Sequence, residues 1–160
     1  MNKNYFSKDI QEFIELLYIH KVKYVIVGGE AVIYYGYPRL TGDVDFFYEN
    51  SKKNVKQLYN VLDNFWEGSI PGIESETDLL ETGVIIQFGV PPNRIDLINT
   101  IDNVSFKEVW ENRTIDHIEI KNCKVDVYLI GPKQLIKNKQ AVKRNKDIDD
   151  LKYLQKRFSS

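Results

Sequence analysis

Two aspartates, Asp43 and Asp45, lie in a run of residues, 43–48, whose apolar and aromatic content is typical of a strand. Because side chains alternate between the two faces of a strand, both carboxylates project from one face and Val44 projects from the other. Neighbouring carboxylates repel each other, and a divalent cation bound between them would reverse that repulsion. The pair therefore predicts a site for a divalent metal ion.

A third carboxylate, Asp96, lies in a second predicted strand, residues 94–98, between Ile95 and Leu97. An ionised carboxylate among core-facing residues is costly unless it is paired, hydrogen-bonded or bound to metal. Three such groups in one cleft would hold two Mg²⁺ ions, with Mn²⁺ as a substitute. Paired ions of this kind clamp the attacking and leaving oxygens of a phosphoryl or nucleotidyl transfer. An ion pair between Asp96 and Arg94 is the simpler alternative.

Two glycines, Gly28 and Gly29, end an apolar run and precede a predicted short helix at residues 30–35. Glycine allows another group to approach the backbone closely, and the N–H groups at a helix start attract phosphates. We therefore expect this turn to contact the phosphates of a nucleoside triphosphate. A tight strand-to-helix turn without any ligand would use the same residues.

The hydrophobic pattern predicts the elements that position these groups. Helices are expected at residues 8–20, 30–35, 52–65, 106–110, 132–143 and 147–157, with a further short helix at 75–81. Strands are expected at residues 22–27, 43–48, 84–88, 94–98, 115–120 and 124–130. This order predicts an α/β fold, α+β by its layers, with a small mixed sheet, helices packed against it and a C-terminal helix pair. We expect residues 1–160 to form one domain, with the active cleft at the edge of the sheet near the glycine turn.

The composition is that of an ordinary globular protein, with 28% charged and 42% apolar residues, and it fits neither the disordered nor the membrane class. No apolar run approaches the roughly 20 residues needed to cross a bilayer, and the first residues lack the apolar core of a signal peptide. We therefore expect a cytoplasmic protein without a membrane partner. The single cysteine, Cys123, excludes an internal disulfide.

The charge is unevenly distributed along the chain. Residues 1–132 carry 13 Lys or Arg against 20 Asp or Glu, a net charge of −7, whereas residues 133–160 carry 9 against 3, a net charge of +6. The basic segment is expected either to form a solvated helix pair against an acidic body or to bind phosphates.

The motifs in this order resemble the DNA polymerase beta-like nucleotidyltransferase superfamily, and are most similar to its small minimal and AbiEii-type members. In that group an Arg and a Ser or Thr precede the aspartate pair, as Arg39 and Thr41 do here. The second motif matches Asp96. The C-terminal motif matches a set of charged residues, Lys139, Arg144, Lys146, Asp147 and Asp150.

This resemblance implies a metal-dependent enzyme that moves a nucleoside monophosphate from a nucleoside triphosphate to a hydroxyl of RNA, particularly a tRNA end, or of protein. Asp43, Asp45 and Asp96 would be the catalytic metal ligands. The nucleotide-binding residues would be Gly28, Gly29, Arg39, Thr41, Lys139, Arg144 and Asp147. The family also implies a possible toxin with an antitoxin partner. A non-catalytic relative that binds nucleotide or a partner is the alternative.

Two residues of the C-terminal motif have competing interpretations. Lys137 competes with Lys139 for the role of the cation that faces the site, because the helix around them is unusually polar. Asp147 would orient a cation or the base, but an aspartate followed three residues later by an acid is also typical of a helix N-terminal cap.

Overall fold

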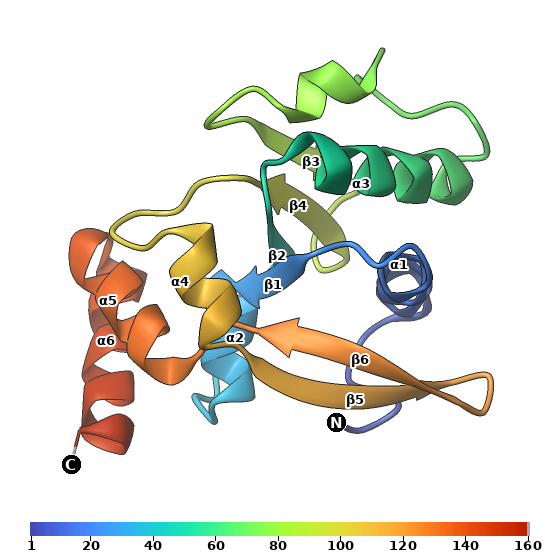
Figure 1. Ribbon diagram of the computed structural model, residues 1–160. Coiled ribbons are helices and arrows are strands. Elements are labelled where there is room, and N and C mark those ends of the chain that lie inside the picture. The colour runs from blue at the N-terminus through green and yellow to red at the C-terminus, as the bar shows by residue number, and fades with distance from the viewer. Residues whose placement is uncertain (160) are drawn as a thin grey trace.

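The computed structural model describes residues 1–159. Its centre is a six-stranded mixed sheet with the order β3-β4-β2-β1-β6-β5 (Figure 1). The strands are β1 (Tyr24–Val27), β2 (Asp43–Tyr48), β3 (Ile85–Phe88), β4 (Arg94–Ile98), β5 (Thr114–Ile120) and β6 (Cys123–Leu129). The helices are α1 (Lys8–Ile19), α2 (Gly28–Tyr34), α3 (Lys52–Phe65), α4 (Phe106–Glu111), α5 (Pro132–Ala141) and α6 (Asn145–Phe158), with a 3₁₀ turn, η1 (Glu76–Leu79). The predicted α/β class, mixed sheet and C-terminal helix pair are confirmed.

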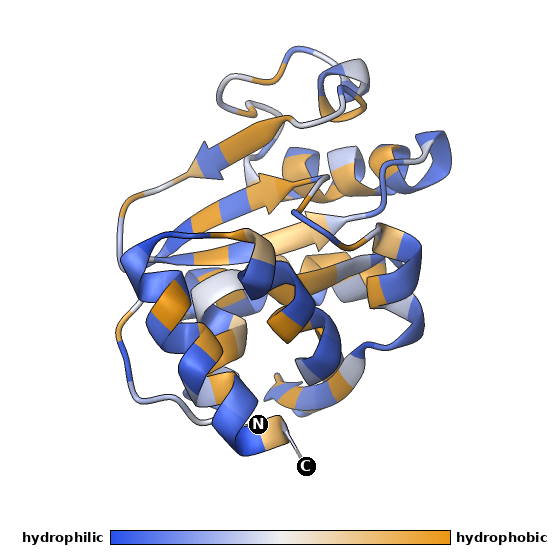
Figure 2. Cartoon of the chain, turned by 90° about the vertical axis from the view of Figure 1, so that its left-hand side faces the viewer, coloured by the Kyte–Doolittle hydropathy of each residue, from blue (hydrophilic) through white to orange (hydrophobic). Residues whose placement is uncertain are grey.

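Each face of the sheet packs against its own group of helices. Helices α1 and α3 cover one face, and α2, α4, α5 and α6 lie on the other (Figure 1). Strand β2 serves both, because Val44 and Phe46 enter the core under α1 and α3 while Phe47 enters the opposite core. Figure 2 shows mostly hydrophilic residues on the outer sides of the C-terminal helices.

The pairing of β2 decides where the predicted carboxylates lie. Strand β2 is antiparallel to β1 and parallel to β4, and the β2–β4 register places Asp45 opposite Asp96. The expected position at the edge of the sheet is wrong, because β3 continues the sheet beyond β4 and leaves both strands in its interior. The carboxylates therefore stand on a face of the sheet, in the part that α5 and α6 overhang.

Local capping signals explain several helix starts. The side chains of Ser7, Ser51 and Ser105 accept hydrogen bonds from backbone N–H groups of α1, α3 and α4, as their positions in the sequence predict. The turn between β5 and β6 uses Lys121 and Asn122, both with positive φ, which matches the twist of a two-residue hairpin.

Two helices begin earlier than the sequence predicts. Helix α2 begins at Gly28 rather than at residue 30, and α6 begins at Asn145 rather than at residue 147. Arg144 is the N-cap residue of α6, so the interpretation of Asp147 as that cap is wrong. Asp147 lies inside the first turn, where its buried carboxylate contacts Lys139 and Arg144. None of the helices in residues 1–159 is long and apolar enough to cross a membrane.

Candidate metal and nucleotide site

Three carboxylates meet on the face of the sheet that α5 and α6 overhang. Asp43, Asp45 and Asp96 each present an oxygen, and these oxygens all lie within 4.8 Å of one another. Asp96 is only 5% exposed, whereas the other two are partly open to the cavity. The strand period and the parallel β2–β4 register together produce this convergence.

Arg94 is the cation in closest contact with this cluster. Its Nε donates to Asp96 Oδ1 at 2.8 Å, and its Nη2 donates to Asp96 Oδ2 at 3.0 Å and to Asp43 Oδ2 at 2.7 Å. The hydrogen bond to Asp96 raises the pKa of the Arg94 guanidinium further. The pairing of Asp96 with Arg94, which the sequence left as an alternative, is therefore present, and it extends to Asp43.

Asp45 lacks such a partner. No hydrogen bond or ion pair within residues 1–159 reaches its carboxylate, which lies against Gly28 instead. Burial, with the charges of Asp43 and Asp96, raises the pKa of Asp45 to about 7. The cluster thus contains one carboxylate whose charge is poorly compensated.

This raised pKa predicts that metal-free protein loses stability as the pH rises from about 4 to about 7. In that range the folded state keeps a proton on Asp45 that the unfolded chain has already released, so unfolding becomes easier with each pH step. We expect the free energy of unfolding to fall by about 1–3 kcal/mol between pH 5 and pH 8. Denaturant unfolding of wild type and Asp45→Asn, without metal, measures this. Equal pH dependence in the two proteins would contradict it.

The two glycines make room for the chain's own side chains. A Cβ on Gly28 would overlap Asp45 Oδ2, and a Cβ on Gly29 would lie 2.7 Å from Arg39 Nη2 and 2.9 Å from Thr41 Oγ1. Gly28 also has φ +68°, a conformation that glycine adopts without strain. The close approach expected at this turn is therefore made by Asp45, Arg39 and Thr41, and contact with phosphates stays a prediction.

We expect Gly28→Ala to weaken metal binding about tenfold or more, because the added methyl group must push the Asp45 carboxylate out of the cluster. Gly72→Ala is a matched control, since Gly72 has φ +73° but a Cβ there would have no atom within 4 Å. Both variants carry the strain of a left-handed alanine, about 1–2 kcal/mol. Isothermal titration with Mn²⁺ separates them, and equal affinities would show that the contact with Asp45 is unimportant.

A buried ionic network forms the opposite wall. Lys139 Nζ lies 2.6 Å from Asp147 Oδ1 and 3.0 Å from Asp150 Oδ2, and both aspartates are fully buried. Arg39 pairs with Asp150 at 2.8 Å, and Arg144 Nε donates to Asp147 at 2.6 Å. Although burial raises the pKa of Asp147, its hydrogen bonds from Arg144 and Lys139 hold that pKa below the usual value. The network ties the loop after α2 to α5 and α6.

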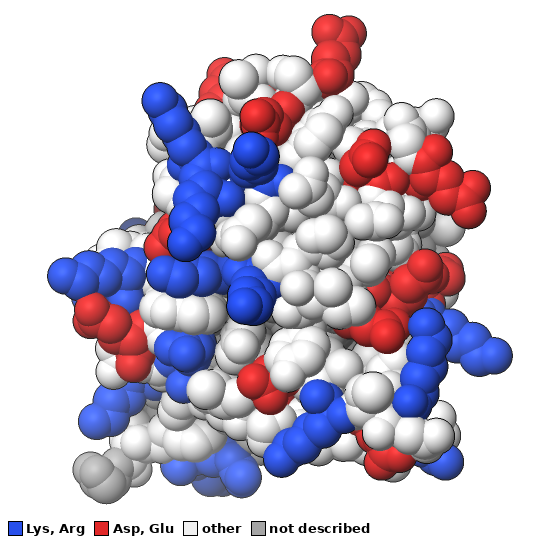
Figure 3. Space-filling view, turned by 45° about the vertical axis from the view of Figure 1, so that its right-hand side comes forward, with Lys and Arg blue, Asp and Glu red and all other residues white. Residues whose placement is uncertain are grey.

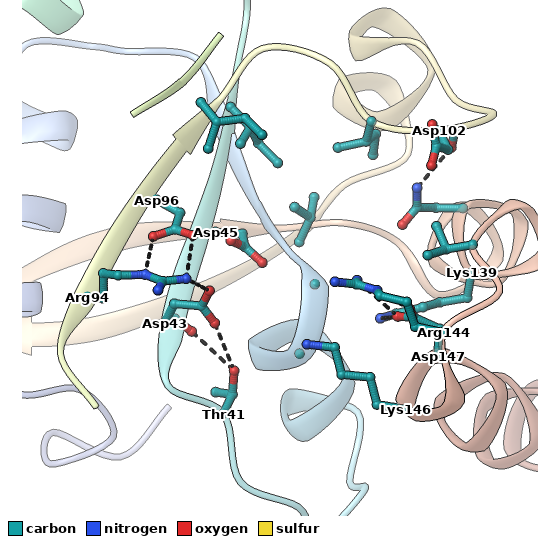
Figure 4. A pocket seen from close by; sticks show the side chains of 18 of the residues that line it. Thr41, Asp43, Asp45, Arg94, Asp96, Asp102, Lys139, Arg144, Lys146 and Asp147 are labelled. Carbon is teal, nitrogen blue, oxygen red and sulfur yellow. Dashed lines mark hydrogen bonds and ion pairs between the residues drawn. The ribbon is translucent and has the colours of Figure 1, made fainter. Parts of the chain in front are cut away.

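A cavity of about 540 Å³ lies between the two walls (Figure 4). All ten residues expected at the site line it, namely Gly28, Gly29, Arg39, Thr41, Asp43, Asp45, Asp96, Lys139, Arg144 and Asp147. Arg144 and Lys146 point across it toward the carboxylates (Figure 4). Lys137 faces away and pairs with Glu108 at 3.1 Å, so Lys139 is the cation of this helix at the site.

The sequence did not predict all of the lining. The sequence suggests Arg94 only as a partner of Asp96, although the strand period places both residues on one face and so indicates that Arg94 also lines the cavity. Gln87 donates to Asp96 Oδ2 at 3.1 Å across the β3–β4 register. At the far end of the cavity, Asn138 Nδ2 donates a hydrogen bond to the Asp102 carbonyl oxygen at 2.8 Å. No pattern near Gln87 or Asn138 indicated these contacts.

The donor set fits a divalent cation. Carboxylate oxygens are the ligands that Mg²⁺ and Mn²⁺ prefer, and a dinuclear centre needs carboxylates that can be shared between ions. Asp43, Asp45 and Asp96 would hold such ions, because their oxygens already converge within 4.8 Å and open onto the cavity.

The fold and this acidic cluster define the class of protein. The chain belongs to a family described as nucleotidyltransferase of unknown function (DUF6036), whose sequence model matches residues 7–155. The resemblance of the sequence to nucleotidyltransferases is therefore confirmed at the level of this family. Membership agrees with the position of the three carboxylates, which is consistent with a catalytic site.

A solved structure supports the same fold. The chain is similar to an antigenic nucleotidyltransferase-like protein from Paracoccidioides brasiliensis, with a TM-score of 0.51 and 19% sequence identity. The match covers 93% of this chain and 77% of the other one. At this identity the likeness concerns the fold alone. None of the curated proteins matches this chain significantly.

Proposed function

We propose that this protein transfers a nucleoside monophosphate from a nucleoside triphosphate to a hydroxyl group, with divalent metal ions as cofactors. The observation that carries the proposal is the cavity of about 540 Å³, in which three convergent carboxylates on one wall face Arg144 and Lys146 on the other. A triphosphate with its cations needs both walls, since the carboxylates hold the cations and the basic side chains contact the remaining phosphate oxygens.

In the proposed reaction the acceptor oxygen attacks the α-phosphorus and forms a new P–O bond. The bond from that phosphorus to the bridging oxygen breaks, pyrophosphate leaves, and the hydroxyl proton passes to Asp96 or to water. Bound divalent cations would polarise the α-phosphate and neutralise the leaving group. Arg144 and Lys146 would bind the β- and γ-phosphates. Lys139 would act mainly through Asp147, which it orients together with Arg144.

RNA is the acceptor that the charge distribution favours. In the described part of residues 133–160 all Lys and Arg residues except Lys139 are exposed, eight in number, whereas Asp149 is the one exposed acid. Asp147 and Asp150 are buried, so the surface is more basic than the sequence count of +6 suggests. Figure 3 shows mostly basic side chains along the left of the face it presents, whereas both signs of charge occur on the right. Such a basic surface suits a polyanion.

The test is incubation with each α-labelled nucleoside triphosphate, Mg²⁺, and either total RNA or total cell protein. We expect label in an RNA band, and label that stays with protein would make a protein side chain the acceptor instead. Mn²⁺ binding is measured beside it. A protein that binds neither metal nor triphosphate and labels nothing contradicts the proposal.

A second candidate is a nucleotide-binding module without turnover. The observation in its favour is that Arg94 already satisfies Asp43 and Asp96 without a metal ion. Melting temperatures with each triphosphate, with and without Mg²⁺, separate the two candidates. A shift that needs no metal favours the binding module, and a shift that needs both favours the transferase.

The finer resemblance, to AbiEii-type toxins with an antitoxin partner, is also part of the proposal. Its support is that Arg39, Thr41 and four of the five residues matched to the C-terminal motif line one cavity. Induced expression should then slow growth of the host cell, and co-expression of a protein encoded beside it should restore growth. An expressed, folded protein that leaves growth unchanged would remove the toxin role but not the transferase.

A further inference from the structure

Arg94 makes the densest set of contacts in the carboxylate cluster. Its guanidinium binds both oxygens of Asp96 and one oxygen of Asp43, at distances of 2.7 to 3.0 Å. Gln87 donates a further hydrogen bond to Asp96 Oδ2. Both oxygens of Asp96 are therefore engaged by donors of this chain, in the forked geometry that makes guanidinium–carboxylate pairs strong.

Asp45 differs from the other two carboxylates. It receives no hydrogen bond within residues 1–159, and its carboxylate stands beside Gly28 at the start of α2. Arg94 thus covers the half of the cluster made by Asp43 and Asp96, and leaves the half made by Asp45 open to the cavity (Figure 4).

We propose that Arg94 is an internal counter-cation that holds Asp43 and Asp96 together and must leave Asp96 before a metal ion can bind there. This inference rests on the proposed function, because it concerns the metal site of that reaction. Arg94 is a positioning residue in this view, since it acts through the carboxylates.

The displacement follows from the geometry. Arg94 and Gln87 donate three hydrogen bonds to Asp96, which has about four lone-pair sites in all. A divalent cation at Asp96 would also be repelled by the positive charge of the Arg94 guanidinium. A cation held through Asp45 requires no such exchange. The cluster is therefore expected to load in order, first through Asp45 and then, with movement of Arg94, through Asp96. The same movement would free Asp96 to accept the proton of the acceptor hydroxyl.

The test is a titration with Mn²⁺ in the absence of nucleotide, in which the electron paramagnetic resonance signal of the free ion measures binding. Wild type is compared with Arg94→Gln and with Arg94→Lys, which keeps the charge but not the forked contact. We expect Arg94→Gln to bind Mn²⁺ at least about tenfold more tightly, or to bind one more ion, and Arg94→Lys to lie between it and wild type. Arg157→Gln, which removes an exposed arginine that does not line the cavity, should match wild type.

A double variant separates displacement from a general charge effect. If Arg94 acts by occupying Asp96, Arg94→Gln should increase the Mn²⁺ affinity only while Asp96 is present. Arg94→Gln/Asp96→Asn should then bind Mn²⁺ no more tightly than Asp96→Asn alone. A gain that persists in the double variant, or equal affinities in wild type, Arg94→Gln and Arg94→Lys, would overturn the proposal while leaving the transferase intact. If none of these proteins binds Mn²⁺, the metal centre fails, and the inference fails with it. Should Arg94→Gln not fold, the comparison of Arg94→Lys with wild type decides.

Discussion

Replacement of Asp43 by asparagine is expected to abolish nucleotidyl transfer while leaving the fold intact. Asp43 links the other two carboxylates, because it lies beside Asp45 on β2 and shares the guanidinium of Arg94 with Asp96. Asparagine keeps the shape and can still accept the hydrogen bond from Thr41, but it lacks the charge that would hold a divalent ion. We expect the rate of labelling to fall by about 1,000-fold or more, since a lost metal ligand raises the barrier by several kcal/mol.

The chain supplies its own control for this variant. Asp149 has the same spacing to Asp147 as Asp45 has to Asp43, but it is exposed on α6 and does not line the cavity. Asp149→Asn removes one negative charge and should leave both labelling and Mn²⁺ affinity within about twofold of wild type. Melting temperatures confirm that both variants are folded. Labelling by Asp43→Asn at the wild-type rate would exclude the proposed mechanism.

The acidic half of the site could be predicted because it depends on local geometry. Strand periodicity alone places Asp43 and Asp45 on one face, and the apolar neighbours of Asp96 identify its strand. The parallel pairing of β2 with β4 could not be predicted, since the order of strands in a sheet depends on long-range packing. The expected cleft at the edge of the sheet is wrong for this reason, because the sequence does not show that β2 pairs with the other side of β4 and leaves β3 at the edge.

The basic half was harder to predict because its residues pair with each other. The polar sequence of α5 does not distinguish Lys137 from Lys139, and only the packing of α6 buries the second of them. Asp147 has the sequence signature of a helix cap, yet it lies inside the first turn of α6, where its buried carboxylate contacts Lys139. An acid is favourable both at the N-cap and in the first turn, so the local sequence does not distinguish the two positions.

Burial of the two acids also changes how the charge of the C-terminal segment is understood. A solvated helix pair and a phosphate-binding role appear as alternatives in the sequence, but the structure makes them compatible. On the inner side of α5 and α6, ion pairs join Asp147, Asp150 and Lys139 in the network with Arg39. The exposed charged residues of the outer side are all basic except Asp149, and Arg144 and Lys146 continue that charge into the cavity.

Replacement of Lys139 by methionine is expected to lower the free energy of unfolding by about 2–4 kcal/mol. This is less than the full cost of unpairing a buried charge, because Asp147 keeps Arg144 and Asp150 keeps Arg39. Lys139 is 4% exposed and contacts both Asp147 and Asp150, which have no access to water that could replace it. Methionine matches the length of the lysine stem, so packing changes little. Lys137→Met, on the same helix, removes a surface pair with Glu108 and should cost less than about 1 kcal/mol. Denaturant unfolding measures both.

A second substitution shows whether the loss comes from uncompensated charge. In Lys139→Met/Asp147→Asn one buried carboxylate is neutral, and its other partner, Arg144, has a side chain that is 64% exposed and can be hydrated instead. We therefore expect the double variant to be more stable than Lys139→Met alone, by about 1–2 kcal/mol. If Lys139 contributed only packing, the second substitution would add to the damage. Recovery of stability, with labelling still impaired, would show that one ion network supports both the fold and the basic wall of the cavity.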